Sequence, residues 1–271
     1  MLKDPAAVLG LVLALVVVLA GVAAPLLAPA SPYVQDLESR LSPPGEETLL
    51  GSDQFGRDMA ARIIWGARIS LKVGVMASVI SLLIGSLLGL LAGYFGGWLD
   101  SLIMRFTDVI MGFPALLFMI AIMAAVEPSL EAAMVAIGLV SWPSMARLMR
   151  STVLTVRHQD YILAARALGL PHRAIILRHV LPNCLSPVIV AFSMGIAGAI
   201  MAEASLSFLG LGAQPPEPSW GSMINDGKDY LRVAPWLSLV PGGAIALAVL
   251  GFNLLGEGLR DALDPKYPRT G

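Results

Sequence analysis

Residues 160–183 gather five side chains that carry, or can take up, a positive charge, within a chain that is otherwise rich in apolar residues. Such groups bind acidic protein surfaces or the phosphates of lipid headgroups. The chain's three histidines, at positions 158, 172 and 179, do not have the spacing of a zinc motif. We call residues 160–183 the elbow; its five groups are Arg166, His172, Arg173, Arg178 and His179.

Glu203 is the second candidate, because it is an ionisable side chain within the apolar segment AIMAEASLSFLGLG. An ionisable group at membrane depth is a functional candidate by default. Three interpretations stay open from the sequence. The carboxylate lines a water-filled pathway or gate, it bonds to the hydroxyls of Ser205 and Ser207, or it reaches water near the membrane interface.

The composition indicates what kind of protein must position these groups. Of 271 residues, 56% are hydrophobic and 14% are charged, whereas soluble domains carry roughly 25% charged residues. We therefore expect an all-α polytopic membrane protein. The net charge of −1 gives no indication of nucleic-acid binding. Cys184 is the only cysteine, so an internal disulfide is excluded.

Apolar runs predict six transmembrane helices, since a span needs about 20 mainly apolar residues. The first run has an alternative interpretation as a signal peptide, because Lys3 precedes it and Ala28-Pro29-Ala30 loosely resembles a cleavage site. Its length favours a retained anchor. The six runs cover about 6–28, 69–93, 106–126, 131–147, 184–206 and 235–256.

Basic residues predict the orientation. The loop 147–183 holds six arginines, and positive loops stay on the cytoplasmic side. With six spans, both termini then lie in the cytoplasm, in the cell (inner) membrane of a bacterium or archaeon. The arginines are Arg147, Arg150, Arg157, Arg166, Arg173 and Arg178.

The segments that flank the spans carry weaker signals. Asp58 is expected to cap a short interfacial helix that ends at Trp65, and Trp220 to Leu231 are expected to form a second one. The segment 29–68 is alternatively an outer gate or a docking surface. Arg105 and Asp108 have the spacing to pair on one helix face, although separate contacts with the membrane interface are preferred.

Small residues at intervals of four predict close contact between helices. The second span carries such a set, and the fifth span has a similar but weaker one. In lipid, these faces let two backbones approach each other. We interpret them as packing seams rather than pathway walls. The first set is Ser81, Gly85, Gly89 and Gly93; the second is Gly195, Gly198, Ala199 and Ala202.

The elbow reads as two short helices separated by a break. Asp160 is expected to cap the first helix, and Gly169 is expected to end it with a positive φ. Pro171 can start the second helix, which should end at Leu181-Pro182, where the fifth span begins. The elbow either rests on lipid headgroups or docks another protein. Ala164 and Ala165, with Gly169 following, favour docking.

The elbow and several other segments of the chain resemble those of a known protein family. Leu163-Ala164-Ala165-x-x-x-Gly169, followed by Leu181-Pro182, is similar to the coupling-loop motif of ABC-importer permeases. Leu163 and His179 depart from its general form and resemble the dipeptide, oligopeptide and nickel branch. Further similar segments span residues 49–265, and they resemble the second, C-type permease of that branch. These segments are 51–71, 92–105, 203–212, 218–227 and 252–265.

The resemblance implies a type I importer fold with a cytoplasmic coupling helix. It implies three parts of the chain. Residues 1–68 form an N-terminal transmembrane anchor and outer segment, and residues 257–271 form a cytoplasmic tail. Residues 69–256 form a permease core of five transmembrane helices, which includes the coupling loop 147–183. The resemblance also implies an ATPase-docking role for eight residues: Asp160, Tyr161, Ala164, Ala165, Arg166, Leu168, Gly169 and Leu170.

The same resemblance implies the partners and the division of labour. These are a second, B-type permease, two ABC ATPases that hold ATP and Mg²⁺, and an extracytoplasmic solute-binding protein. The chain has no G-x-x-x-x-G-K-[ST] phosphate loop, so we expect it to bind no cofactor and to be no enzyme itself. Peptides are the expected substrate, with nickel or glutathione as alternatives. A secondary transporter or channel and an intramembrane enzyme are the alternatives from other classes.

Overall fold

The computed structural model describes residues 4–28, 30–45 and 48–263, and within them the regular structure is helical. One isolated bridge joins Ser52 to Asp58. The helices are α1 Pro5–Val22, α2 Ala24–Leu27, η1 Leu37–Ser39, α3 Met59–Phe95, α4 Gly97–Met111, α5 Ala115–Ala124, α6 Leu130–Val156, α7 Asp160–Ala167, α8 His172–Ile175, η2 Ile176–Val180, α9 Leu181–Phe208, α10 Trp220–Gly227, η3 Lys228–Tyr230 and α11 Trp236–Leu263.

Within the described part of the chain, five helices are long and apolar enough to cross a membrane, and α4 with α5 makes a sixth span if that bent pair counts as one. The span expected over 106–126 is not one continuous helix, because α4 and α5 meet at an angle of 86°. Gly112-Phe113-Pro114 forms the break between them. Pro114 has no N–H to donate and disfavours helical geometry at the residue before it.

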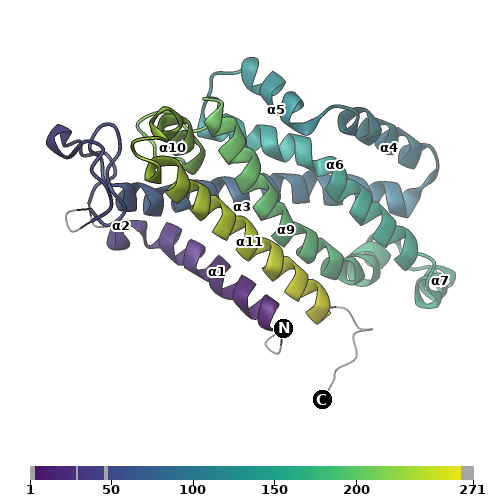
Figure 1. The fold of residues 1–271 in the computed structure, drawn as a ribbon. Helices are drawn as coiled ribbons and strands as arrows, with labels where there is room; N and C mark the ends of the chain where they lie inside the picture. The colour runs from purple at the N-terminus through teal and green to yellow at the C-terminus, as the bar shows by residue number, and fades with distance from the viewer. Residues whose placement is uncertain (1–3, 29, 46–47, 264–271) are drawn as a thin grey trace.

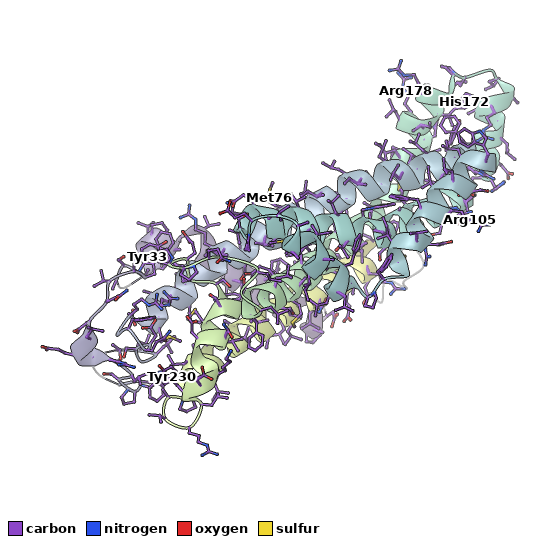
Figure 2. All side chains as sticks on the ribbon, turned by 90° about the horizontal axis from the view of Figure 1, so that it is seen from above. Tyr33, Met76, Arg105, His172, Arg178 and Tyr230 are labelled. Carbon is purple, nitrogen blue, oxygen red and sulfur yellow. The ribbon has the colours of Figure 1, made fainter. Side chains whose placement is uncertain are left out.

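The two ends of the bundle have different contents. The N-terminal end of α1, the C-terminal end of α11 and helix α7 lie at one end, and α2, the segment 30–58 and α10 lie at the other (Figure 1). Side chains show the same division, with His172 and Arg178 at one end and Tyr33 and Tyr230 at the other (Figure 2). We call these the α7 end and the α10 end.

The contact between α3 and α6 confirms the predicted seam. A Cβ atom added at Gly85 would lie 2.6 Å from Met145 Cβ, and one added at Gly93 would lie 2.9 Å from the Arg150 carbonyl oxygen. A Cβ added at Gly89 would overlap the Ala146 carbonyl oxygen. Only glycine therefore allows the two backbones to approach this closely.

Helix α3 differs from the expected short helix followed by a span, since it runs unbroken from Met59 to Phe95. Asp58 caps it as predicted, accepting hydrogen bonds from the backbone N–H groups of Ala60 and Ala61. Gly66 does not break the helix. It makes room for Trp220, whose indole N–H donates to the Ile63 carbonyl at 3.0 Å.

Helix α9 also begins earlier than expected. The prediction that the second elbow helix ends at Leu181-Pro182 is wrong, because α8, η2 and α9 form one continuous helix from His172 to Phe208. Near the beginning of this helix, η2 is a π turn, after which the Leu181 N–H donates to the Ile176 carbonyl five residues earlier. The wider turn accommodates Pro182, which would interrupt regular α-helical hydrogen bonding.

The first span is packed into the bundle. A Cβ added at Gly10 of α1 would lie 2.5 Å from Leu254 Cβ of α11, and one added at Gly251 of α11 would lie 2.9 Å from Leu13 Cβ. This close packing between α1 and α11 favours the retained anchor. At the α10 end, α10 followed by the 3₁₀ turn η3 confirms the helix expected over Trp220 to Leu231, with a change of helix type after Gly227.

Candidate functional site: the elbow and the interior of the bundle

The first elbow helix, α7, begins one residue earlier than predicted. Gln159 rather than Asp160 is the N-cap, and it makes no side-chain capping bond. Asp160 lies in the first turn, where a carboxylate interacts favourably with the positive end of the helix dipole.

The end of α7 follows the prediction. Gly169 has φ of +75°, and the Leu170 N–H donates to the Ala165 carbonyl at 3.2 Å, the bond that closes a helix with a left-handed terminal residue. Pro171 is the N-cap of α8. A Cβ added at Gly169 would meet no atom within 4 Å, so this position requires glycine for its backbone conformation and not for space.

Helix α7 has a buried base and an exposed face. Ile162 is fully buried, together with Ile175 and Val180 of the following helix, whereas Leu168 is 80% exposed. Of the eight residues assigned to docking, Ala165 is buried and Leu170 is half-buried, so both face the bundle. The other six form the exposed face: Asp160, Tyr161, Ala164, Arg166, Leu168 and Gly169.

Polar contacts join the elbow to the end of α3. The Tyr94 hydroxyl and His172 Nδ1 are hydrogen-bonded at 2.9 Å, and the Arg166 guanidinium lies 5.1 Å from the centre of the Tyr94 ring. Arg157, just before α7, donates to the Gly93 carbonyl at 2.8 Å. The elbow is therefore fixed to α3 as well as to α6 and α9, and a force applied to it acts on all three helices.

Two further arginines of the basic loop hold α4 against α6. Arg150 makes a bidentate contact with Asp100 at 2.5 and 2.6 Å, and Arg147 Nη2 lies 2.6 Å from Asp108. The pair of Arg105 with Asp108, which the sequence left as an alternative, is therefore replaced by a contact between helices. Sequence spacing could not reveal it, because Arg147 follows Asp108 by 39 residues.

Glu203 is fully buried between α9 and α3. The Ser207 hydroxyl donates to Oε1 at 2.6 Å, and the Ser70 hydroxyl of α3 lies 3.4 Å from Oε2. The predicted bond from Ser207 is confirmed, whereas Ser205 instead donates to the Met201 carbonyl. Ser70, the partner that the sequence did not indicate, is 133 residues away. The role of Glu203 in a pathway or gate stays a prediction.

A cavity of about 360 Å³ lies between the middle portions of α3, α6 and α9, next to α5. It contradicts one prediction, because the small residues of the fifth span line this cavity instead of forming a tight seam. Sequence analysis also missed the serines around it. The polar and small lining residues are Ser78, Ser81, Ser141, Ser144, Gly195 and Gly198.

Metal-binding side chains do not gather at the elbow or elsewhere in the described residues. Within 4–28, 30–45 and 48–263, no group of three or more His, Cys, Asp or Glu side chains has the arrangement of a metal site.

Two family matches cover most of the sequence. Residues 85–269 match the binding-protein-dependent transport system inner membrane component, and residues 1–44 match the N-terminal TM domain of oligopeptide transport permease C.

Relatives and solved structures agree with these matches. The dipeptide transport system permease protein DppC of Alkalihalophilus pseudofirmus is 46% identical over 97% of this chain and 87% of its own length. The glutathione transport system permease protein GsiD of Shigella flexneri is 48% identical over 85% of this chain and 76% of its own length. A chain of the inward-facing MetNI methionine ABC transporter shares the fold, with a TM-score of 0.64, 17% identity, and coverage of 76% of this chain and 98% of that one.

The apolar helices and these relatives identify an integral membrane protein. Its relatives are ABC-importer permeases, which are not themselves ATPases. These relatives favour an ABC-importer permease over a secondary transporter and over an intramembrane enzyme. The chain belongs to the family of binding-protein-dependent transport system inner membrane components, and it is a permease subunit of an ABC importer of the dipeptide and oligopeptide branch.

Proposed function

We propose that this permease forms a solute pathway with a second, B-type permease, and that the exposed face of α7 docks a cytoplasmic ABC ATPase. The single observation that carries the docking proposal is the division of α7 into a buried base and an exposed face. Leu168 is 80% exposed although Ile162, six residues earlier, is fully buried. Apolar side chains that are exposed together on one short segment, here Tyr161 at 46% and Leu168 at 80%, are typical of an interaction site.

The same proposal fixes the orientation and the partners. Six arginines in the loop 147–183 support a cytoplasmic location for the α7 end and for both termini. The α10 end then faces outward, toward an extracytoplasmic solute-binding protein. Two ATPases hold the ATP and Mg²⁺, and this chain holds no cofactor. The permease resides in a bacterial or archaeal cell (inner) membrane.

The domain division also stays a proposal, with 1–68 as anchor and outer segment, 69–256 as permease core and 257–271 as cytoplasmic tail. Residues 264–271 of that tail lie outside the described residues.

We infer di- and oligopeptides as the substrate class, because the relatives that match 97% of this chain include two named as dipeptide permeases. Glutathione is the alternative that a specific observation favours, since the glutathione permease of Shigella flexneri is 48% identical. Glutathione is itself a small peptide, so both substrates present amide groups and carboxylates. Nickel remains the more distant alternative.

The test is uptake by the complete complex in proteoliposomes, which contains both permeases, the ATPases and the binding protein. We expect radiolabelled dialanine to accumulate on the side of the membrane where the ATPases lie, and only when ATP and Mg²⁺ are present on that side. Unlabelled peptide should compete with this uptake. Accumulation that follows an ion gradient without ATP would contradict the proposal. If glutathione or Ni²⁺ competed with the uptake of dialanine and unlabelled peptides did not, glutathione or nickel would replace peptides as the proposed substrate.

A further inference from the structure

The cavity of about 360 Å³ lies at mid-depth in the bundle, because its lining residues come from the middle of α3, α6 and α9. Its volume is within the range of about 300–1,000 Å³ that small-molecule sites usually have. Apolar side chains such as Met119 and Val140 form part of the wall. Four serines supply the hydroxyl groups: Ser78, Ser81, Ser141 and Ser144.

The serines of the wall differ in how they meet the cavity, because Ser144 is exposed and Ser141 is half-buried, whereas Ser78 is enclosed between the helices. Its side chain is buried, with 6% of the residue exposed, and its Oγ has no hydrogen-bond partner among the described residues. Elsewhere in these helices, hydroxyls donate to the carbonyl four residues earlier, as Thr152 of α6 does to Leu148 at 2.9 Å. A buried polar group without a partner costs about 1–3 kcal/mol.

The glycines of α9 keep the space open. A Cβ added at Gly198 would meet no atom within 4 Å, and one added at Gly195 would lie 3.5 Å from Ser78 Oγ. The glycines of α3 differ sharply, because a Cβ at Gly89 would overlap α6. The glycines of α3 therefore allow close packing against α6, whereas Gly195 and Gly198 of α9 leave open space.

A second cavity, of about 630 Å³, lies farther toward the α10 end along the same helices. Lys72 of α3 lines this second cavity, and Ala77 of the same helix lines the first. The two residues are five positions apart, which is about 7.5 Å along the helix axis. The charged residues of the second cavity have both signs: Arg68, Lys72, Glu127, Glu131 and Glu217. Such a mixture suits a solute that carries both an ammonium and a carboxylate group.

We propose that these two cavities are this chain's part of the solute path, and that its serine hydroxyls contact the main-chain amides of an extended peptide. This inference rests on the proposed function and specifies the site. A hydroxyl both donates and accepts a hydrogen bond, so it suits peptide N–H and C=O groups equally. Contacts to the main chain do not depend on side chains, which fits a path that passes peptides of many sequences.

The first test fills the cavity. Gly198→Leu places an isobutyl group in open space, and we expect ATP-driven uptake of dialanine by the complete complex to fall more than tenfold. Gly243→Leu of α11 is the matched control, because a Cβ there also meets no atom within 4 Å and Gly243 does not line this cavity. Its uptake should stay within twofold of wild type. Unchanged uptake in Gly198→Leu, with the complex recovered intact, would overturn the inference.

The second test measures water access and needs no substrate. In a Cys184→Ala background, Ser141→Cys should react at least tenfold faster with a charged, membrane-impermeant methanethiosulfonate than Leu139→Cys. Leu139 lies two residues away on α6, is 39% exposed and does not line this cavity. Equal, slow reaction at both positions would overturn the path, even in a complex that takes up dialanine.

The two failures are distinguishable. Slow labelling at Ser141→Cys beside normal ATP-driven uptake removes the path through this cavity and leaves the proposed function standing. Fast labelling at Ser141→Cys, together with a wild-type complex that takes up no dialanine, supports a hydrated path and removes the assignment of peptides to it.

Discussion

The α10 end and the α7 end of the bundle are both polar, but they are built differently. At the α10 end, charges are buried. Asp53 is 3% exposed and accepts a hydrogen bond from Arg57 Nε at 2.6 Å, and Arg62 Nε lies 3.6 Å away. Trp236 donates to the Ser52 carbonyl at 3.2 Å across 184 residues. At the α7 end, an apolar base is buried and the polar and apolar groups of the helix surface are exposed.

This difference indicates where stability and partner contact are located. The α10 end buries the carboxylate of Asp53 with the guanidinium groups of Arg57 and Arg62, so a change there should destabilise the fold. The α7 end leaves Tyr161 and Leu168 of its exposed face open to solvent, although Arg166 of the same face lies over the Tyr94 ring. A change on that face should alter the assembly of the complex more than it alters the stability of the permease.

The largest expected loss of stability follows from Asp53→Ala. The change leaves the buried guanidinium groups of Arg57 and Arg62 without their carboxylate, and breaking a buried pair costs about 3–5 kcal/mol. Denaturant unfolding of the purified permease in detergent measures this loss. Lys72→Gln is the control, because the Lys72–Glu131 pair is exposed and such pairs contribute about 0–1 kcal/mol. Similar losses in both variants would remove the contrast between the ends.

The next largest effect is local to the elbow. Ile162→Ala removes a fully buried side chain from the base of α7, and such changes cost about 2–5 kcal/mol. We expect the amides of α7 to exchange hydrogen faster while those of α3 remain protected. Leu163→Ala, at a position that is 48% exposed, is the matched control and should leave exchange unchanged. Equal exchange in the two variants would show that the base does not hold α7.

Gly169→Val should have a smaller effect on stability and a large effect on coupling. A β-branched residue at φ of +75° costs about 1–2 kcal/mol, and relief of this strain would redirect the chain after α7. Uptake by the complete complex should fall while membrane insertion continues. Gly169→Asn should retain uptake, since asparagine tolerates this conformation. Normal uptake and normal recovery of the complex with Gly169→Val would contradict the proposed role of the elbow.

The smallest effect on stability is expected for Leu168→Glu. This side chain is 80% exposed, and exposed substitutions usually change stability by less than about 0.5 kcal/mol. Copurification of the ATPases with the permease should nevertheless decrease several-fold, because the charge enters the docking face. A denaturation midpoint that shifts as far as that of Asp53→Ala would show that Leu168 supports the fold instead.

Local signals in the sequence predicted the features that depend on neighbouring residues. Gly169 and Pro171 predicted how the elbow turns, since a positive φ and a missing N–H act within a few residues. The glycines at intervals of four on α3 predicted a seam, because helical periodicity alone places them on one face.

Features that depend on distant residues could not be predicted. The bonds from Ser70 to Glu203 and from Arg147 to Asp108 join different helices. The break before Pro114 was missed because an average of hydropathy over a window ignores one residue's backbone geometry. The α9 glycines were assigned to a seam, since sequence cannot distinguish a small residue that admits a neighbouring helix from one that leaves a cavity.

The most direct test of the docking surface is cross-linking in the assembled complex, with a photoreactive side chain introduced either at Leu168 or at Val233. Both positions are exposed, at 80% and 70%. Leu168 directly follows α7, whereas the Val233 N–H donates to the carbonyl of Tyr230, which lies at the α10 end (Figure 2). We predict that position 168 cross-links to an ABC ATPase and that position 233 does not. No ATPase adduct at position 168, or an equal one at position 233, would contradict the account.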